Sequence, residues 1–142
     1  MPLLEQVLEK NPESVKIVFK HFPLRNHRFD MLAAIAALAA ERQGKFWEFH
    51  DLLFKDYNHL NTQKIKEIAQ KLNLDMVKFD QDQKDPGISA IINRDSAEGN
   101  RIGVRGTPTV FINGRLLRNR NMAGFQAMID NTLKKEGAPK GP

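Results

Sequence analysis

A proline inside an otherwise strand-like segment limits what this chain can fold into. Residues 104–114, VRGTPTVFING, include strand-favouring residues at 109–112, followed by the turn-forming pair Asn113-Gly114. Pro108 cannot donate a backbone hydrogen bond, so it is expected only at the start of a strand, at an edge or in a bulge. The segment therefore predicts a hairpin, TPTVFI-NG-RLLRN, whose first strand begins beside a proline.

Most of the remaining sequence has the apolar spacing of amphipathic helices. This spacing predicts one helix over residues 2–10 and another that starts near Asn121. Between them, residues 28–101 are expected to be helical apart from short breaks, whereas residues 15–19, VKIVF, alternate as a strand does. The order helix, strand, helical block, strand, strand, helix predicts a layered α/β or α+β fold, which we expect to be a single domain over residues 1–142.

Several boundaries inside the helical block are marked by residues that cap or stop helices. Asn61-Thr62 and Asp75 are suitable N-caps, and Pro86 suits the first turn of a helix. Gln43-Gly44 and Gly103 are suitable helix ends.

The composition excludes several classes of function. The 142 residues include no cysteine, which rules out a disulfide scaffold, a cysteine-ligated metal site and thiol chemistry by this chain alone. The net charge is +5, but the basic residues are dispersed, so we do not expect nucleic acid as a partner. No apolar run is long enough to span a bilayer, and the first ten residues lack the basic and apolar regions of a signal peptide. The sequence does not indicate a compartment.

Other residue types that often carry chemistry give weak signals. No two histidines have the i, i+4 spacing of ligands on one helix face, so we expect no metal and no other cofactor. Asp30, near the start of a helix, is either a base or a helix cap. Three aromatic residues form either a ligand cage or part of the core, and the core is favoured: Phe46, Trp47 and Phe49.

The segment VRGTPTVFINGR resembles the cis-proline segment of DsbA-like thiol–disulfide oxidoreductases, which have a thioredoxin-like fold. The stretches VKIVFKHFPL, AAIAALAAERQGKFWEFHDLLF and GFQAMIDNTLKKEG are similar to stretches that occur in the same order in that family. The resemblance covers nearly the whole chain and implies that residues 28–101 are an all-helical insertion. It also implies a cis peptide bond between Thr107 and Pro108.

The resemblance implies a site for a protein or peptide substrate but no catalytic residue in this chain. Thr107 and Pro108 would position the substrate, because the residue before the cis-proline offers its backbone N–H and C=O to an extended peptide. Arg105 lies beside them and either meets an acidic substrate or is solvated. His27 follows FPLRN in a segment that borders the active-site side in the family, so it either lines the groove or is a loop histidine.

The family's chemistry depends on a Cys-x-x-Cys at the start of a helix that follows a central first strand, and this sequence contains neither. Without that strand, the strands expected at 15–19 and 109–112 would each lack a partner. We expect a second copy, a domain swap or the pairing of these two strands with each other to fill the gap.

Three functions remain open at this point. In the first, a longer form of the protein exchanges thiols and disulfides in protein substrates, and this chain alone is inactive. In the second, the chain is a non-redox module that binds peptides or proteins with its cis-proline groove. Nucleic-acid binding is the third. Proteins of this family are often periplasmic or exported, but any export signal would lie upstream of residue 1.

Overall fold

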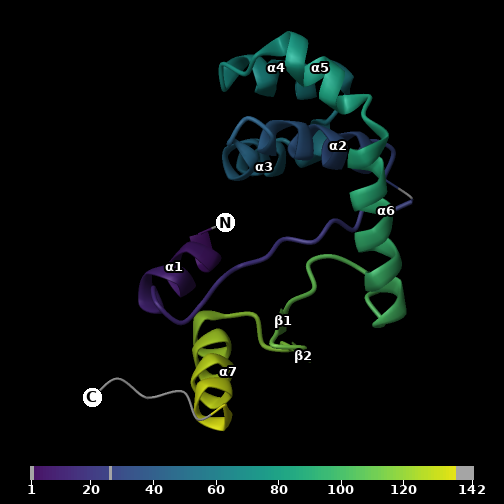
Figure 1. The fold of residues 1–142 in the computed structure, drawn as a ribbon. Helices are drawn as coiled ribbons and strands as arrows, with labels where there is room; N and C mark the ends of the chain where they lie inside the picture. The colour runs from purple at the N-terminus through teal and green to yellow at the C-terminus, as the bar shows by residue number, and fades with distance from the viewer. Residues whose placement is uncertain (1, 26, 137–142) are drawn as a thin grey trace. The chain divides into compact units, whose positions relative to one another are not determined.

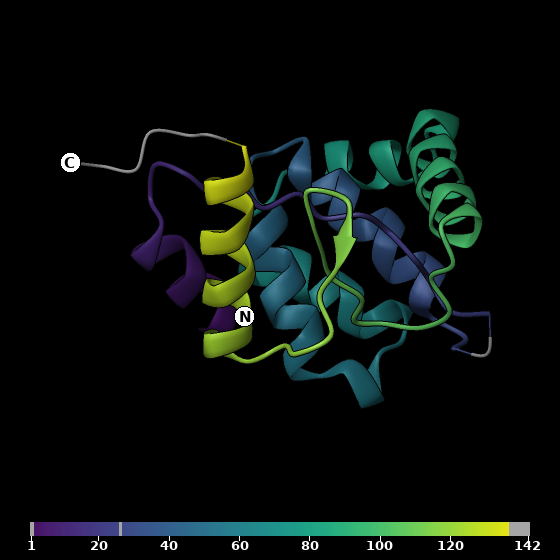
Figure 2. The same ribbon diagram turned by 90° about the horizontal axis from the view of Figure 1, so that it is seen from below.

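The computed structural model describes residues 2–25 and 27–136, and the chain divides into two compact units (Figure 1). One unit combines the segment up to Val18 with the segment from Gly106 onward, and the other is Phe19–Arg105. Figure 2 shows the same ribbon after a turn of 90°. None of the described helices is long and apolar enough to cross a membrane.

The unit Phe19–Arg105 is helical. In chain order it contains α2 (Asp30–Glu41), α3 (Phe46–Lys55), the short 3-10 helix η1 (Tyr57–His59), α4 (Thr62–Lys71), α5 (Met76–Gln83) and α6 (Pro86–Arg101). These helices lie within residues 28–101, where the apolar spacing predicts helix.

Local capping sets the boundaries of these helices. The side chains of Asn61, Asp75 and Asp85 accept hydrogen bonds from backbone N–H groups in the first turns of α4, α5 and α6. Gly44 and Gly103 have φ angles of +73° and +90°, the left-handed conformation that glycine adopts most easily after a helix. The predicted caps at Asn61 and Asp75 are confirmed.

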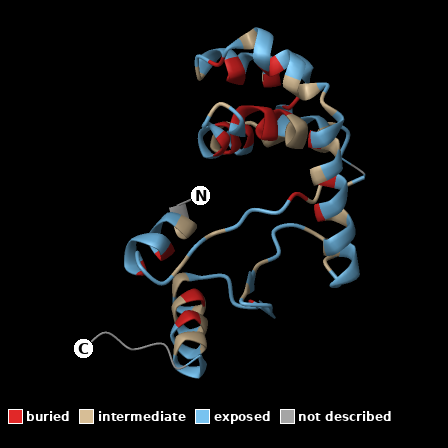
Figure 3. Cartoon of the chain, in the orientation of Figure 1, coloured by how far each residue is buried: buried red, intermediate tan, exposed pale blue. Residues whose placement is uncertain are grey.

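The core of this unit is built around the alanine-rich α2, which packs against α3, α4, α5 and α6. Five consecutive residues of α2, Ala36–Ala40, are buried (Figure 3). Because four of the five are alanines, neighbouring helices can approach α2 closely. Larger side chains from those helices fill the remaining space: Phe49, Phe79, Ile88 and Ile92.

An exposed ion-pair cluster joins the end of α2 to α5 and α6. The Arg42 guanidinium lies 3.0 Å from an Asp82 oxygen and 2.8 Å from an Asp85 oxygen. Hydrogen bonds to Asp85 and Asp82 raise the pKa of Arg42, so it stays charged. Because the cluster is exposed to solvent, we expect it to contribute little to the free energy of unfolding.

The other unit consists of α1 (Pro2–Lys10), β1 (Phe111–Ile112), β2 (Arg115–Leu116) and α7 (Met122–Lys135). The strands are antiparallel, with Phe111 opposite Leu116 and Ile112 opposite Arg115. Asn113 and Gly114 form the turn, with φ angles of +46° and +83°, as two-residue hairpin turns of this kind require. A small core underlies the hairpin: Val7, Leu117, Phe125 and Ile129.

A reciprocal pair of side-chain amides joins the end of α1 to α7. Asn11 Nδ2 donates to Gln126 Oε1 at 2.9 Å, and Gln126 Nε2 donates to Asn11 Oδ1 at 3.0 Å. Asn11 Nδ2 also donates to the Val7 carbonyl at 2.8 Å. Asn11 is buried, so these bonds satisfy polar atoms that are shielded from water.

The predicted strand at residues 15–19 is wrong. Among the described residues the sheet has only β1 and β2, and residues 15–19 pair neither with them nor with residues 109–112. A strand needs a hydrogen-bonded neighbour, and the alternating pattern alone supplies none. The hairpin itself is confirmed, but each strand has two residues instead of the longer 107–112 and 115–119. The fold is therefore mostly helical and has less sheet than we predicted.

Gly124 gives a test of packing in the hairpin unit. A Cβ atom at this position in the first turn of α7 would lie 1.9 Å from the Asn119 carbonyl oxygen. Gly124→Ala should therefore lower the free energy of unfolding by about 2–3 kcal/mol, because backbone must move to make room. Urea unfolding followed by circular dichroism measures this change.

Gly87→Ala, in the first turn of α6, is the matched control. The atom nearest to its added Cβ is Asp85 Oδ1, at 3.2 Å, which also accepts the Gly87 N–H and needs to shift by only a few tenths of an ångström. The alanine should leave stability unchanged or raise it by up to about 1 kcal/mol through helix propensity. Equal losses in the two variants would contradict the close approach at Gly124.

Candidate functional site

The proline loop lies in the hairpin unit and is braced by two hydrogen bonds. The Thr107–Pro108 peptide bond is cis, as the sequence resemblance implies. On one side, the Thr109 hydroxyl donates to the Gly106 carbonyl at 2.6 Å. On the other, the Arg120 guanidinium donates to the Pro108 carbonyl.

Thr107 lies between these braced residues. Its side chain is exposed, and its backbone N–H and C=O make no hydrogen bond to any residue in the described part of the chain. Pro108 is also exposed. The loop thus offers an unpaired backbone donor and acceptor on a segment fixed from both sides.

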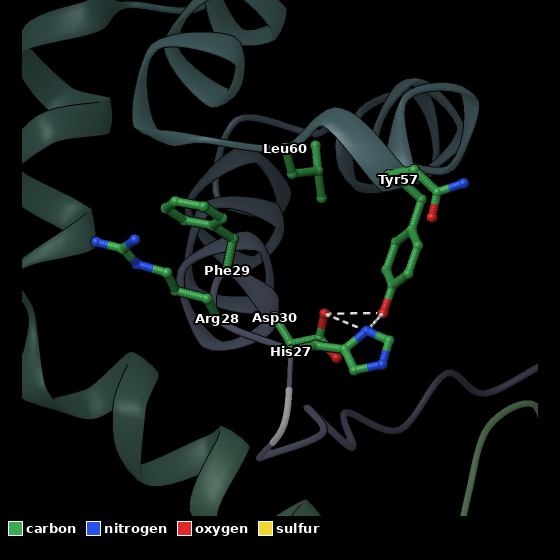
Figure 4. A pocket seen from close by; sticks show the side chains of 7 residues that line it. His27, Arg28, Phe29, Asp30, Tyr57 and Leu60 are labelled. Atoms are coloured by element: carbon green, nitrogen blue, oxygen red, sulfur yellow. Dashed lines mark hydrogen bonds and ion pairs between the residues drawn. The ribbon is translucent and has the colours of Figure 1, made fainter.

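The other two predicted substrate-binding residues belong to the helical unit. Arg105 is exposed, and its guanidinium forms no ion pair with a described residue. His27 contacts Tyr57 and Asp30. The Tyr57 hydroxyl lies 2.6 Å from His27 Nδ1 and donates to Asp30 Oδ1 at 2.9 Å (Figure 4).

Asp30 is neither isolated nor a helix cap. Phe29 is the N-cap residue of α2, and it makes no capping hydrogen bond with its side chain. The Asp30 carboxylate instead accepts the Leu24 backbone N–H at 3.0 Å and the Tyr57 hydroxyl. The interpretation of Asp30 as a cap is therefore wrong. Its interpretation as a base stays a prediction.

These residues border a pocket of about 330 Å³. Figure 4 shows Phe29 and Tyr57 on opposite sides of it, with Leu60 and Asp30 between them. The pocket thus has aromatic and aliphatic walls and a carboxylate. Its lining residues come from the start of α2 and from the segment around η1: His27, Arg28, Phe29, Asp30, Tyr57, Asn58 and Leu60.

Tyr57 keeps its proton over a wide pH range. Burial raises the pKa of Tyr57 to about 12, and the hydrogen bond to Asp30 and the charge of Asp30 act in the same direction. The phenol is therefore a hydrogen-bond donor at neutral pH.

The aromatic residues of α3 divide between the core and the surface. Phe46 and Phe49 are buried, which confirms their interpretation as core, whereas Trp47 is 42% exposed. Burial lowers the pKa of His50, which packs among these rings, and Asp51 partly opposes the shift. Among the described residues, no group of three or more His, Asp and Glu side chains is placed to hold a metal.

Sequence reasoning missed Tyr57 altogether. Its partner His27 is 30 residues away in the sequence and its partner Asp30 is 27 residues away, so no local pattern indicates them. The one available signal is that Tyr57 is the single tyrosine of the chain, which by itself points to no role.

A comparison with protein families matches residues 2–131 to a family model described as thioredoxin. The chain belongs to the DsbA-like thioredoxin family. The family predicted from the sequence is therefore confirmed.

Relatives of this DsbA-like domain include proteins of two different kinds. The chain is 28% identical over 141 residues to the probable disulfide bond formation protein D of Bacillus anthracis, covering 94% of this chain and 64% of that protein. It is 39% identical over 103 residues to the Na⁺/H⁺ antiporter NhaA 3 of Salinispora tropica, covering 72% of this chain and 16% of the antiporter. It thus spans about a sixth of the antiporter and less than two thirds of the disulfide bond formation protein.

A solved structure shows the same fold. The chain matches a thioredoxin-like oxidoreductase from Silicibacter pomeroyi DSS-3 with a TM-score of 0.82 and 26% sequence identity, covering 94% of this chain and 77% of that one. The chain is a DsbA-like domain of thioredoxin-like fold that contains no cysteine.

The Tyr57 hydroxyl gives a direct test of the pocket. Because the chain has one tyrosine, absorbance titration of tyrosinate reports Tyr57 alone. We expect a midpoint near pH 12 and, in Asp30→Asn, a lower midpoint, because the negative charge of Asp30 is removed while the burial of the phenol, the larger cause, remains. Circular dichroism at each pH checks that the protein stays folded.

Asp80→Asn removes the same charge from an exposed position on α5 and is the control. It should leave the midpoint unchanged. A wild-type midpoint near 10 in the folded protein would contradict the partly buried hydrogen bond between Tyr57 and Asp30.

Proposed function

We propose that this chain is the substrate-binding part of a DsbA-like thiol–disulfide oxidoreductase. Thr107 and Pro108 hold an extended segment of a protein substrate, and cysteines outside this sequence perform the exchange. Family membership supports the class of reaction. The unpaired backbone groups of Thr107 are the observation that carries the substrate-binding role.

An extended peptide has backbone donors and acceptors of the same kind as a strand edge. The free N–H and C=O of Thr107 can pair with such a peptide in the manner of a short added strand. The bonds from Thr109 and Arg120 hold the adjoining carbonyls, so little conformational freedom remains to be lost at this loop on binding. Backbone pairing accepts many side chains, which suits an enzyme that acts on varied proteins.

Arg105 is a proposed further contact for the substrate. Its guanidinium is exposed and has no ion-pair partner among the described residues, so it is available to an acidic residue of a bound segment. His27 is also a proposed substrate contact, because its side chain is 40% exposed.

The redox step needs groups that this sequence does not contain. In disulfide exchange a thiolate attacks one sulfur of a disulfide, a mixed disulfide forms, and the other sulfur leaves as a thiolate. With no cysteine in 142 residues, the chain can neither supply the attacking thiolate nor receive the disulfide. Its contribution is to hold the substrate.

A binding module without redox chemistry is the second candidate, and the absence of cysteine is the observation that favours it. Peptide binding by the protein isolated from its natural source distinguishes the two candidates. Peptide binding that changes with reductants or thiol blockers supports the oxidoreductase, and binding that is insensitive to both supports the module. Pairing with a second copy, including a domain swap, is a compatible proposal for the unpaired segment at 15–19.

Thr107→Pro tests the backbone contact because it removes the Thr107 N–H. With the reduced, carboxymethylated insulin B chain as the extended probe, calorimetry should show affinity about threefold to tenfold weaker than wild type, the loss expected for one hydrogen bond. Thr107→Ala keeps the N–H and should bind within about twofold of wild type by the same arithmetic. Equal binding by all three proteins would overturn this role for Thr107.

The chain alone should not catalyse disulfide exchange. In the reduction of insulin by dithiothreitol, measured by turbidity, adding the chain should leave the rate at its value in buffer, because no thiolate is present on the protein. A human or bacterial thioredoxin with Cys-x-x-Cys serves as the positive control. Acceleration by this chain would contradict the division of roles proposed here.

A further inference from the structure

The two contacts of the Tyr57 hydroxyl limit which tautomer of His27 is favourable. Tyr57 has one hydroxyl proton but two close partners, His27 Nδ1 at 2.6 Å and Asp30 Oδ1 at 2.9 Å. An ionised carboxylate only accepts, so the phenol must donate to Asp30. The contact with His27 is then favourable only if Nδ1 carries a proton and donates it to the Tyr57 oxygen.

When the His27 imidazole is neutral, Asp30 has no cationic partner among residues 2–25 and 27–136. Its side chain is only 13% exposed, and its two described hydrogen bonds come from neutral donors, the Leu24 N–H and the Tyr57 hydroxyl. His27 Nδ1 is 3.8 Å from the carboxylate, where it forms an ion pair only if the imidazole is charged, and it lies closer to the Tyr57 oxygen, at 2.6 Å. A largely buried carboxylate of this kind attracts a cation, because few water molecules remain to solvate its charge.

The walls of the pocket suit a cation on an apolar stem. Phe29 and Tyr57 present aromatic rings on opposite sides, and Leu60 adds an aliphatic surface (Figure 4). The Arg28 guanidinium carbon lies 5.4 Å from the centre of the Phe29 ring, so one face of this ring contacts a cation of the chain itself. In Figure 4 that guanidinium extends away from Asp30, so it does not neutralise the carboxylate.

We propose that this pocket binds a primary ammonium or guanidinium group carried on an apolar stem, as in a lysine or arginine side chain or a small organic amine. Asp30 holds the charge, Phe29 faces the cation, and Leu60 contacts the stem. All of these residues lie in the helical unit, so the proposal does not depend on peptide binding at Thr107.

The first test is titration with n-butylammonium at pH 8, followed by the amide NMR signals of residues 27–30 and 57–60. We expect these signals to shift with saturation, and we expect 1-butanol and butyrate, which match the stem but lack the positive charge, to bind at least fivefold more weakly. Equal binding of all three probes, or no binding of butylammonium, would overturn the proposal.

Variants identify the groups responsible. Asp30→Asn keeps the size and the acceptor oxygen but removes the charge, and should weaken butylammonium binding at least fivefold. Phe29→Leu should weaken it about twofold to fivefold, through loss of the aromatic face. Asp80→Asn, on exposed α5, should bind as wild type does.

Tyr57→Phe separates charge recognition from a merely structural role of this cluster. It keeps the aromatic wall and removes the hydroxyl, so butylammonium should bind as tightly as in wild type or more tightly. If Tyr57→Phe and Asp30→Asn lose binding equally, the cluster acts only by holding the fold and the proposal fails. Circular dichroism confirms that each variant is folded.

The source of the cation is resolved by comparing n-butylammonium with the peptide acetyl-Gly-Lys-Gly-amide. Tighter binding of the peptide supports a lysine side chain of a protein as the ligand, and tighter binding of the free amine supports a small amine. If neither shifts the pocket signals while the Thr107 variants still change binding of the insulin B chain, this inference fails and the proposed function stands.

Discussion

The helical unit depends on the small side chains of α2. Four alanines among Ala36–Ala40 let four other helices pack against one short helix, and larger residues there would force those helices apart. Because α2 is held along its length, both of its ends are fixed. Its first residue, Asp30, is thereby placed in the pocket, and Arg42, just beyond its last turn, reaches Asp82 and Asp85.

The two candidate sites use opposite kinds of polar group. Around Thr107 the available groups are backbone atoms with no net charge, which we propose to recognise the extended form of a chain and not its side chains. In the helical unit the available group is a carboxylate between aromatic rings, which we propose to recognise charge. In the two proposals made above, a DsbA-like domain without cysteine has two groups that would select a ligand, although it contains no thiol for disulfide exchange.

Features that depend on neighbouring residues were predicted correctly from the sequence. Features that depend on residues distant in the sequence were not. Asn61, Asp75 and the pair Asn113-Gly114 act within three residues of themselves, so the sequence reveals their roles. Residues 15–19 look like a strand, but a strand also requires a neighbour that the sequence pattern cannot show. Tyr57 was missed for the same reason, since its partners join it only through the packing of η1 beside the start of α2. Recognition of the family supplied what local patterns could not, namely the cis bond at Pro108.

The single tryptophan and the single tyrosine of the chain, Trp47 and Tyr57, both belong to the helical unit. Intrinsic fluorescence of this protein therefore originates entirely from one of its two units. The aromatic residues of the hairpin unit are phenylalanines, such as Phe111 and Phe125. This unit therefore has almost no fluorescence at the same wavelengths. Far-ultraviolet dichroism, in contrast, includes α1 and α7. A thermal melt of the unlabelled protein can therefore show whether the two units unfold together. If they do, fluorescence and far-ultraviolet circular dichroism change at the same temperature.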